Sequence, residues 1–197
     1  MSASSSNARK HESRNPIQRA LIGRFTRALV SEVAALRPKS VLEVGCGEGY
    51  MLDALARAGI GAELVGVELS AQAVAEAKAR LGDRATIQTG DARELGRDGR
   101  RFDVVLMLEH LDDPAAMLPV LAALCRHAVV LSVPWEPWFR ALNLVRGRHL
   151  ARLGNHPEHL QQFGRRAFIE LVRTYFEPIA CPSVWPWTMV VARPLHA

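Results

Sequence analysis

Cysteine is scarce in this chain of 197 residues. Only three cysteines occur, Cys46, Cys125 and Cys181, and they are widely spaced and odd in number. Such a set forms no disulfide framework and lacks the paired spacing of a zinc site, and it is typical of proteins from reducing compartments. We therefore expect a cytoplasmic location.

Long apolar segments are also missing. No apolar run approaches the roughly 20 residues that a membrane-spanning helix needs, and the first 14 residues are polar and serine-rich. They lack the apolar stretch of a secretory signal. We predict a disordered tail at residues 1–14, followed by a single domain at residues 15–197 that is large enough for a hydrophobic core.

Basic and acidic residues are unevenly distributed along the chain. Residues 1–40 hold eight basic and two acidic residues, residues 41–133 nine and fourteen, and residues 134–175 seven and three. Basic segments that flank an acidic core could hold an anionic substrate or contact a membrane surface. Alternatively, the basic residues could simply lie on a solvated helix face and in a tail. No dense Lys/Arg stripe and no nucleic-acid module occurs, so we expect no nucleic-acid partner.

The hydrophobic pattern alternates between strand and helix. Asn15 and Pro16 predict the start of a helix that reaches about residue 37. Further predicted strands lie at about 40–45, 63–68, 85–89, 102–108, 128–133, 176–181 and 185–192, and further helices at about 50–58, 71–81, 114–124 and 165–175. Strands that alternate with helices predict a doubly wound, parallel α/β sheet.

Three glycines follow the first predicted strand at alternate positions, Gly45, Gly47 and Gly49. A strand, a glycine turn and a helix bring backbone against a nucleotide, because glycine reaches positive φ and has no Cβ to hold a ligand away. The apolar strand before them contains Glu43. A carboxylate in such a place is unfavourable unless it is paired, so we expect a cationic or hydrogen-donating ligand beside it.

Acidic residues also close the next two strands. Glu68 ends the strand at 63–68, where a carboxylate accepts hydrogen bonds from ribose hydroxyls, and Asp91 follows the strand at 85–89, where it would accept from an exocyclic amine. A dinucleotide fingerprint would need a third glycine at position 50, where the chain has Tyr50. An NAD-dependent reductase is therefore a disfavoured alternative.

Taken together, four blocks resemble the class I S-adenosylmethionine-dependent methyltransferases. They are residues 41–49, 66–70, 90–92, and 102–105 through 112–114, and they follow the family's order and spacing over residues 40–133. The resemblance implies a Rossmann-like, seven-stranded sheet with helices on both faces, an antiparallel last strand and an N-terminal helical extension. It also implies S-adenosylmethionine as the cofactor.

The resemblance also assigns roles to individual residues. The loop would pass beneath the methionine part of the cofactor, with Glu43 directed toward its ammonium, while Glu68 would hold the ribose. Leu69, Asp91 and Ala92 would contact adenine, and Leu108 would lie near the methionine moiety. The implied cofactor-binding residues are therefore Glu43, Gly45, Cys46, Gly47, Gly49, Glu68, Leu69, Asp91, Ala92 and Leu108.

Methyl transfer from a sulfonium is an in-line displacement in which alignment supplies much of the rate. A base is needed only when the acceptor must lose a proton, and Glu109 and His110 are the candidates, or they shape the loop. Glu109-His110 also resembles part of a Glu-x-x-Glu-His metal signature, but Leu106 replaces the first acid. His156 and His159 are the residues that would complete such a site; we expect no metal.

Residues 134–163 are predicted to form a lid or a substrate-specificity insertion. The candidate substrate-binding residues are Trp135, Trp138, Arg140, His156 and His159. We predict O- or C-methylation of an aromatic, lipid-like or secondary-metabolite acceptor by a monomer or homodimer, in a broad bacterial group that resembles the quinone-biosynthesis methyltransferases. The alternatives to this function are an RNA or protein acceptor and a non-catalytic cofactor-binding subunit. For the aromatic residues near the C-terminus, the alternatives to substrate binding are packing in the core and peripheral membrane contact.

Overall fold

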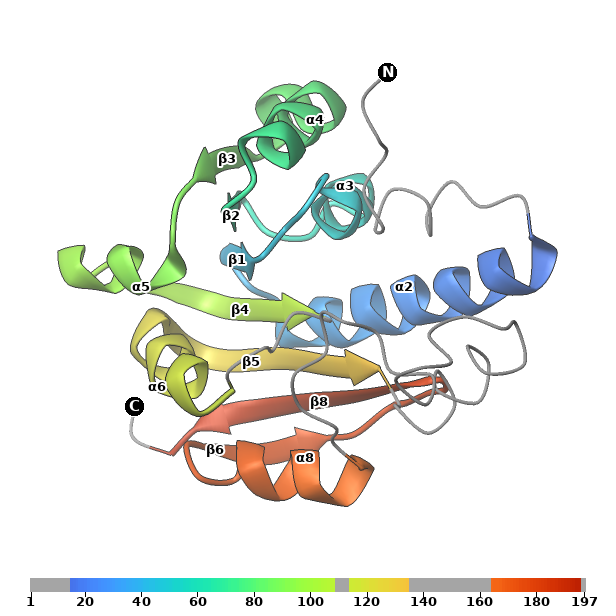
Figure 1. The fold of residues 1–197 in the computed structure, drawn as a ribbon, viewed down its shortest axis with the longest axis vertical. Helices are drawn as coiled ribbons and strands as arrows, with labels where there is room; N and C mark the ends of the chain where they lie inside the picture. The colour runs from blue at the N-terminus through green and yellow to red at the C-terminus, as the bar shows by residue number, and fades with distance from the viewer. Residues whose placement is uncertain (1–14, 109–113, 135–163, 196–197) are drawn as a thin grey trace, which may run out of the picture.

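A computed structural model describes residues 15–108, 114–134 and 164–195 of the chain (Figure 1). The described residues form one sheet in the order β3-β2-β1-β4-β5-β8-β6, with β7 paired to β8. The strands are β1 (Ser40–Val44), β2 (Glu63–Glu68), β3 (Thr86–Thr89), β4 (Phe102–Leu108), β5 (Cys125–Pro134), β6 (Phe176–Ala180), β7 (Ser183–Val184) and β8 (Trp187–Pro194).

The direction of the strands confirms the predicted architecture. Strands β1 to β5 pair in parallel, whereas β8 is antiparallel to both β5 and β6. The strand order reverses between β1 and β4, since β2 and β3 lie on one side of this pair and β5 on the other (Figure 1). Doubly wound sheets bind ligands outside the carboxyl ends of the strands at such a reversal.

Helices cover both faces of the sheet. They are α2 (Pro16–Leu36), α3 (Tyr50–Arg57), α4 (Ala71–Leu81), α5 (Ala92–Leu95), α6 (Pro114–Leu124) and α8 (Arg165–Val172), with short 3₁₀ turns η1 (Gly82–Arg84) and η2 (Gly96–Asp98). Buried side chains of α2, α3 and α4 form one core with the sheet. Those of α5, α6 and α8 form a second core on the opposite face.

Local sequence signals explain where the helices begin. The Asn15 side chain accepts hydrogen bonds from the backbone N–H groups of Ile17 and Gln18, and the Ser70 hydroxyl accepts from Ala73 N–H. Asn15 is the helix start that the sequence predicts, and both residues act as N-caps that satisfy donors lacking partners within the helix.

Two boundaries and one short helix are among the differences from the predicted elements. Strand β5 begins at Cys125 rather than about 128, because its first residues pair with the start of β4 across a register shift. Helix α8 ends at Val172, where tighter turns from Thr174 and Tyr175 close it. Helix α5 was not predicted, because four residues are too few to establish a helical period.

The N-terminal helix α2 packs into the core beside the last strand, β8. Phe25, Leu29 and Val33 are its buried residues. The Phe25 ring lies with its centroid 5.2 Å from that of Trp187 on β8. Trp187 is thus an aromatic residue that packs against the core, which is the alternative that the sequence left open for it. None of the helices in the described ranges has the length and apolar character needed to cross a membrane.

At the amino end of β4, Asp103 joins two central strands. Its Oδ2 atom accepts hydrogen bonds from the backbone N–H groups of Lys39 at 2.8 Å and Ser40 at 3.3 Å. The Ser40 hydroxyl in turn accepts from Asp103 N–H. Burial opposes ionisation, but these backbone donors, with His127 and Arg126 nearby, hold the pKa of Asp103 below its usual 3.8. The acid of this sequence block therefore has a structural role.

We predict that Asp103→Ala lowers the free energy of unfolding by about 1–3 kcal/mol, because it leaves buried backbone donors without partners. A depressed pKa means that the aspartate stabilises the fold above its unfolded pKa of about 3.9. This stabilisation disappears as the pH falls below that value.

Urea unfolding of both proteins at several pH values tests this prediction. The difference between wild type and Asp103→Ala should be constant above about pH 5 and shrink below about pH 4. Asp83→Ala, at an exposed position, is the control. An equal loss from Asp83→Ala, or a difference that persists unchanged at low pH, would contradict the structural role of Asp103.

Candidate functional site

The glycine loop, residues 45–49, connects β1 to α3 at the carboxyl edge of the sheet. Its three glycines have φ angles of 70°, 51° and 78° at Gly45, Gly47 and Gly49. Residues other than glycine rarely adopt this left-handed region of backbone conformation. The backbone N–H groups of Gly45 and Cys46 both donate to the Val67 carbonyl at the end of β2. The loop is therefore fixed against the neighbouring strand.

Two glycines also permit close approach between elements. A Cβ on Gly49 would lie 2.8 Å from Leu81 Cδ1 of α4, and a Cβ on Gly66 of β2 would lie 2.7 Å from Cys46 Sγ. The Cys46 side chain is 4% exposed, and burial raises the pKa of its thiol. Cys46 is consequently an inert packing residue, and only its backbone is available to a ligand beside the loop.

Glu68 links the glycine loop to the helix that follows β2. Its Oε2 atom accepts a hydrogen bond from Gly47 N–H at 3.0 Å, and its Oε1 atom accepts from Ser70 N–H at 3.0 Å. Each carboxylate oxygen has two acceptor positions. The bonds to Gly47 and Ser70 therefore orient the carboxylate and leave acceptor capacity on both oxygens.

Glu43 lies near the carboxyl end of β1, in register with Gly66 of β2 and Leu106 of β4. It is 3% exposed, and its Oε2 atom has no hydrogen-bond partner. Burial, the largest cause, raises the pKa of Glu43 to about 8; the Glu68 charge adds to this rise, and a backbone hydrogen bond from Leu52 opposes it. The ligand-free site thus favours a protonated carboxyl with an unused polar atom.

The remaining predicted cofactor residues differ in exposure. Leu69, directly after Glu68, is 72% exposed, whereas Ala92 and Leu108 are 4% and 7% exposed. Asp91 caps α5, since its carboxylate accepts from Arg93 N–H at 2.9 Å, and it also pairs with the Arg93 guanidinium. Leu69 is accessible to an adenine ring, while the Ala92 side chain is in the core and offers only backbone.

Several predicted residues lie outside the described part of the chain. They are the catalytic candidates Glu109 and His110 and the substrate candidates Trp135, Trp138, Arg140, His156 and His159. Within the described ranges, no group of three or more His, Cys, Asp or Glu side chains is arranged to hold a metal. The roles of these seven residues stay predictions.

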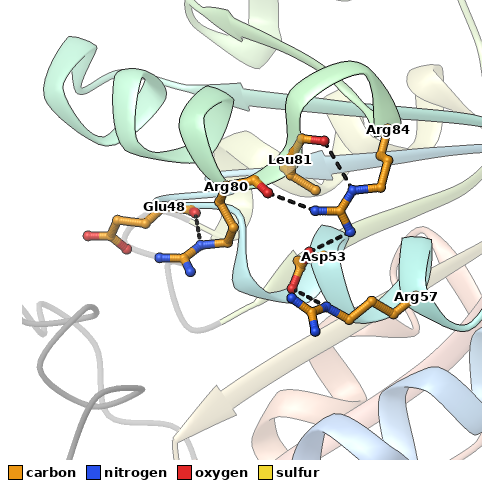
Figure 2. Close-up of polar contacts among 6 residues, drawn as sticks. All are labelled: Glu48, Asp53, Arg57, Arg80, Leu81 and Arg84. Atoms are coloured by element: carbon orange, nitrogen blue, oxygen red, sulfur yellow. Dashed lines mark hydrogen bonds and ion pairs between the residues drawn. The ribbon is translucent and has the colours of Figure 1, made fainter.

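Polar contacts between α3 and α4 were not foreseen from the sequence. Asp53 of α3 pairs with Arg57 at 2.7 Å and with Arg84 of η1 at 2.7 Å, and Arg80 of α4 donates to the Glu48 carbonyl in the glycine loop (Figure 2). The four-residue spacing of Asp53 and Arg57 is a signal that the sequence does contain. The contacts of Arg80 and Arg84 depend on how the two helices pack.

Comparison with known proteins agrees with this geometry. A family model described as "Methyltransferase domain" matches residues 41–128. A ubiquinone biosynthesis O-methyltransferase of Coxiella burnetii (strain Dugway 5J108-111) is 34% identical over 103 residues, which are 49% of this chain and 43% of the relative. The chain thus spans less than half the length of that curated relative.

Solved structures extend the similarity to nearly the whole chain at the level of fold. Magnesium protoporphyrin IX methyltransferase from Synechocystis PCC 6803 superposes with a TM-score of 0.67 and 20% identity, covering 94% of this chain and 88% of its own. A plantazolicin methyltransferase gives a TM-score of 0.71 and 15% identity, covering 96% and 90%. Residues 41–128 thus match a methyltransferase domain, in line with the resemblance seen in the sequence, and the solved structures share the fold.

The raised pKa of Glu43 predicts how stability depends on pH without ligand. Folding favours the protonated form of the Glu43 carboxyl. The stability that this protonated carboxyl contributes to the fold is complete below its ordinary pKa of 4.5 and is lost as the pH rises through about 8. Glutamine does not titrate. We therefore expect Glu43→Gln to gain stability relative to wild type across this window, by at most about 1.4 kcal/mol per pH unit.

Urea unfolding of the ligand-free proteins at pH 5, 6.5 and 8 measures this difference. Glu76→Gln, on the exposed side of α4, is the control and should track wild type. A wild-type curve parallel to that of Glu43→Gln throughout the window would show that the carboxyl does not titrate there.

Proposed function

We propose that this protein transfers a methyl group from S-adenosylmethionine to a small-molecule acceptor. The observation that carries the proposal is the pair of carboxyl groups, Glu43 and Glu68, near the carboxyl ends of the adjacent strands β1 and β2, beside the glycine loop. One has a buried oxygen without a partner, and the other is held by backbone N–H groups. A ligand with a cation at one end and a diol farther along complements this arrangement.

The methionine end of the cofactor fits Glu43. Its ammonium group would supply both the positive charge and the hydrogen-bond donors that the buried carboxyl lacks, and a nearby opposite charge favours the ionised form. The pKa of Glu43, which burial raises to about 8 without ligand, would fall when the ammonium is bound. This explains why a carboxyl is tolerated in an otherwise apolar strand.

The nucleoside end fits the residues that follow β2. The remaining acceptor positions of Glu68 suit the two ribose hydroxyls, and the exposed Leu69 side chain suits one face of adenine. Asp91 and the backbone of Ala92 would recognise the adenine edge. Asp91 also caps α5, so its carboxylate is oriented whether or not a ligand is present.

Bound S-adenosylmethionine supplies a methyl group on a positively charged sulfur, which is already activated for displacement. The residues of this chain therefore have to align the donor with the acceptor and exclude water. Leu108, at the buried end of β4, is the apolar residue next to the methionine moiety in this proposal. Glu109 and His110 follow it directly, and they remain our candidates to take a proton from an acceptor that must lose one.

We assign acceptor specificity to residues 134–163, within a single domain at 15–197. The first residue of this segment, Pro134, is the last residue of β5 and pairs with Trp187. The segment therefore starts at the same edge as the glycine loop, where Trp135, Trp138, Arg140, His156 and His159 would meet the acceptor. The names of the similar proteins refer to ubiquinone biosynthesis, magnesium protoporphyrin IX and plantazolicin, which supports an aromatic or lipid-like acceptor for O- or C-methylation. A monomer or homodimer stays our expectation.

Labelled methyl transfer tests the function directly. The purified protein is incubated with methyl-labelled S-adenosylmethionine and, separately, with metabolite, RNA and protein fractions of a cell extract. We expect the label in an extractable small molecule, identified by mass. Label that appears in RNA or protein instead would overturn the proposed acceptor class, and the absence of cofactor binding in calorimetry would overturn the proposed activity.

We predict that Glu68→Ala weakens the binding of S-adenosylhomocysteine at least about tenfold, because it removes both the ribose acceptor and the bond to Gly47. Isothermal titration calorimetry measures the affinity, and thermal unfolding shows whether the fold is retained. Glu76→Ala on the exposed side of α4 is the matched control. Unchanged affinity in a folded Glu68→Ala protein would refute the assignment.

A further inference from the structure

Arg80, near the end of α4, contacts the glycine loop. Its Nε donates a hydrogen bond to the backbone carbonyl of Glu48 at 2.9 Å, and its guanidinium lies 3.8 Å from the centroid of the Tyr50 ring. Hydrogen bonds from a charged donor are stronger than neutral ones, and a cation over an aromatic face adds attraction. One half-buried side chain therefore contacts both the loop and the first residue of α3.

The bond from Arg80 completes the restraint of one peptide unit. The peptide between Glu48 and Gly49 has its carbonyl bound to Arg80, and its N–H donates to the Cys46 carbonyl at 2.9 Å. A planar peptide that is bonded at both groups cannot rotate about its axis without losing both bonds. Arg80 thus restrains the loop at the position where two left-handed glycines, Gly47 and Gly49, flank a single residue.

Apolar packing from α4 supports the same part of the loop. The position that a Cβ of Gly49 would take lies 2.8 Å from Leu81 Cδ1 and 3.2 Å from Ala77 Cβ. Packing of this kind limits how closely the loop approaches α4, but it does not determine which way a peptide carbonyl points. The hydrogen bond from Arg80 to the Glu48 carbonyl is a directional contact that does.

We infer that Arg80 is a positioning residue that pre-organises the glycine loop for cofactor binding through the Glu48 carbonyl and the Tyr50 ring. The inference rests on the proposed function, since the loop is the part of the site that would pass beneath the methionine moiety. A loop that reaches its binding conformation only part of the time binds more weakly by that fraction. Arg80 would therefore increase affinity by keeping the loop in one conformation.

Arg84, one turn farther along the chain, provides a matched control (Figure 2). It donates to the carbonyls of Leu81 and Arg80 and pairs with Asp53 of α3. Its loss removes an arginine and a link between α3 and the end of α4, as the loss of Arg80 does. These contacts of Arg84 are made to α3 and α4, so the two variants separate general packing from positioning of the loop.

The experiment compares wild type, Arg80→Ala, Arg80→Lys and Arg84→Ala by calorimetric titration with S-adenosylhomocysteine and by thermal unfolding without ligand. We expect Arg80→Ala to bind about tenfold more weakly, whereas Arg84→Ala stays within about twofold of wild type. Arg80→Lys should be intermediate, because one ammonium lacks the planar fork that serves carbonyl and ring together. Amide exchange at Gly49 should be faster in Arg80→Ala than in wild type and Arg84→Ala, with Arg80→Lys in between.

Each result has one meaning. Equal affinities of Arg80→Ala and wild type, or an equal loss in Arg80→Ala and Arg84→Ala, would overturn the positioning role. Should Arg80→Ala fail to fold, Arg80→Lys takes its place. The positioning role would then be overturned if Arg80→Lys bound S-adenosylhomocysteine as tightly as wild type and its Gly49 amide exchanged at the wild-type rate. Failure of wild type to bind S-adenosylhomocysteine would instead count against the proposed function.

Discussion

The close approach of the glycine loop to β2 and α4 is the constraint on which the site depends. No Cβ fits at Gly49 against Leu81 or at Gly66 against Cys46 without a contact below 3 Å. Because the backbone of these glycines packs directly against neighbouring side chains, the loop lies close to the end of β2. The N–H groups of Gly45 and Cys46 therefore reach the Val67 carbonyl. The loop conformation, the entry into α3 and the orientation of Glu68 all follow from this packing.

The two acids beside the loop differ because their surroundings differ. Glu68 is partly exposed and accepts bonds from Gly47 and Ser70, so it acts as a structural link as well as a candidate ribose acceptor. Glu43 is buried in the sheet, where burial raises its pKa to about 8 and one oxygen has no partner. An ammonium ligand would relieve the unfavourable burial, which couples the binding of the proposed cofactor to the ionisation of Glu43.

The acid at the other end of the sheet shows why a sequence block is not a functional site by itself. Asp103 belongs to one of the four blocks that resemble methyltransferases, yet it accepts bonds from Lys39 and Ser40 at the amino end of β4. It joins two strands far from the carboxyl edge, where Glu43 and Glu68 lie. A block that accompanies a family can thus preserve the sheet that supports the site rather than the site itself.

Local patterns in the chain predicted the class of fold, most element boundaries, the Asn15 helix start and the position of the glycine loop. Periodicity, capping residues and turn glycines act over a few residues, so they can be recognised without knowing what lies across the sheet. Three contacts are known from the packed structure alone: Cys46 is buried against Gly66, Trp187 packs on Phe25, and Arg80 reaches the Glu48 carbonyl. These contacts join residues far apart in the chain, and their geometry depends on how helices and strands pack, which no local pattern records.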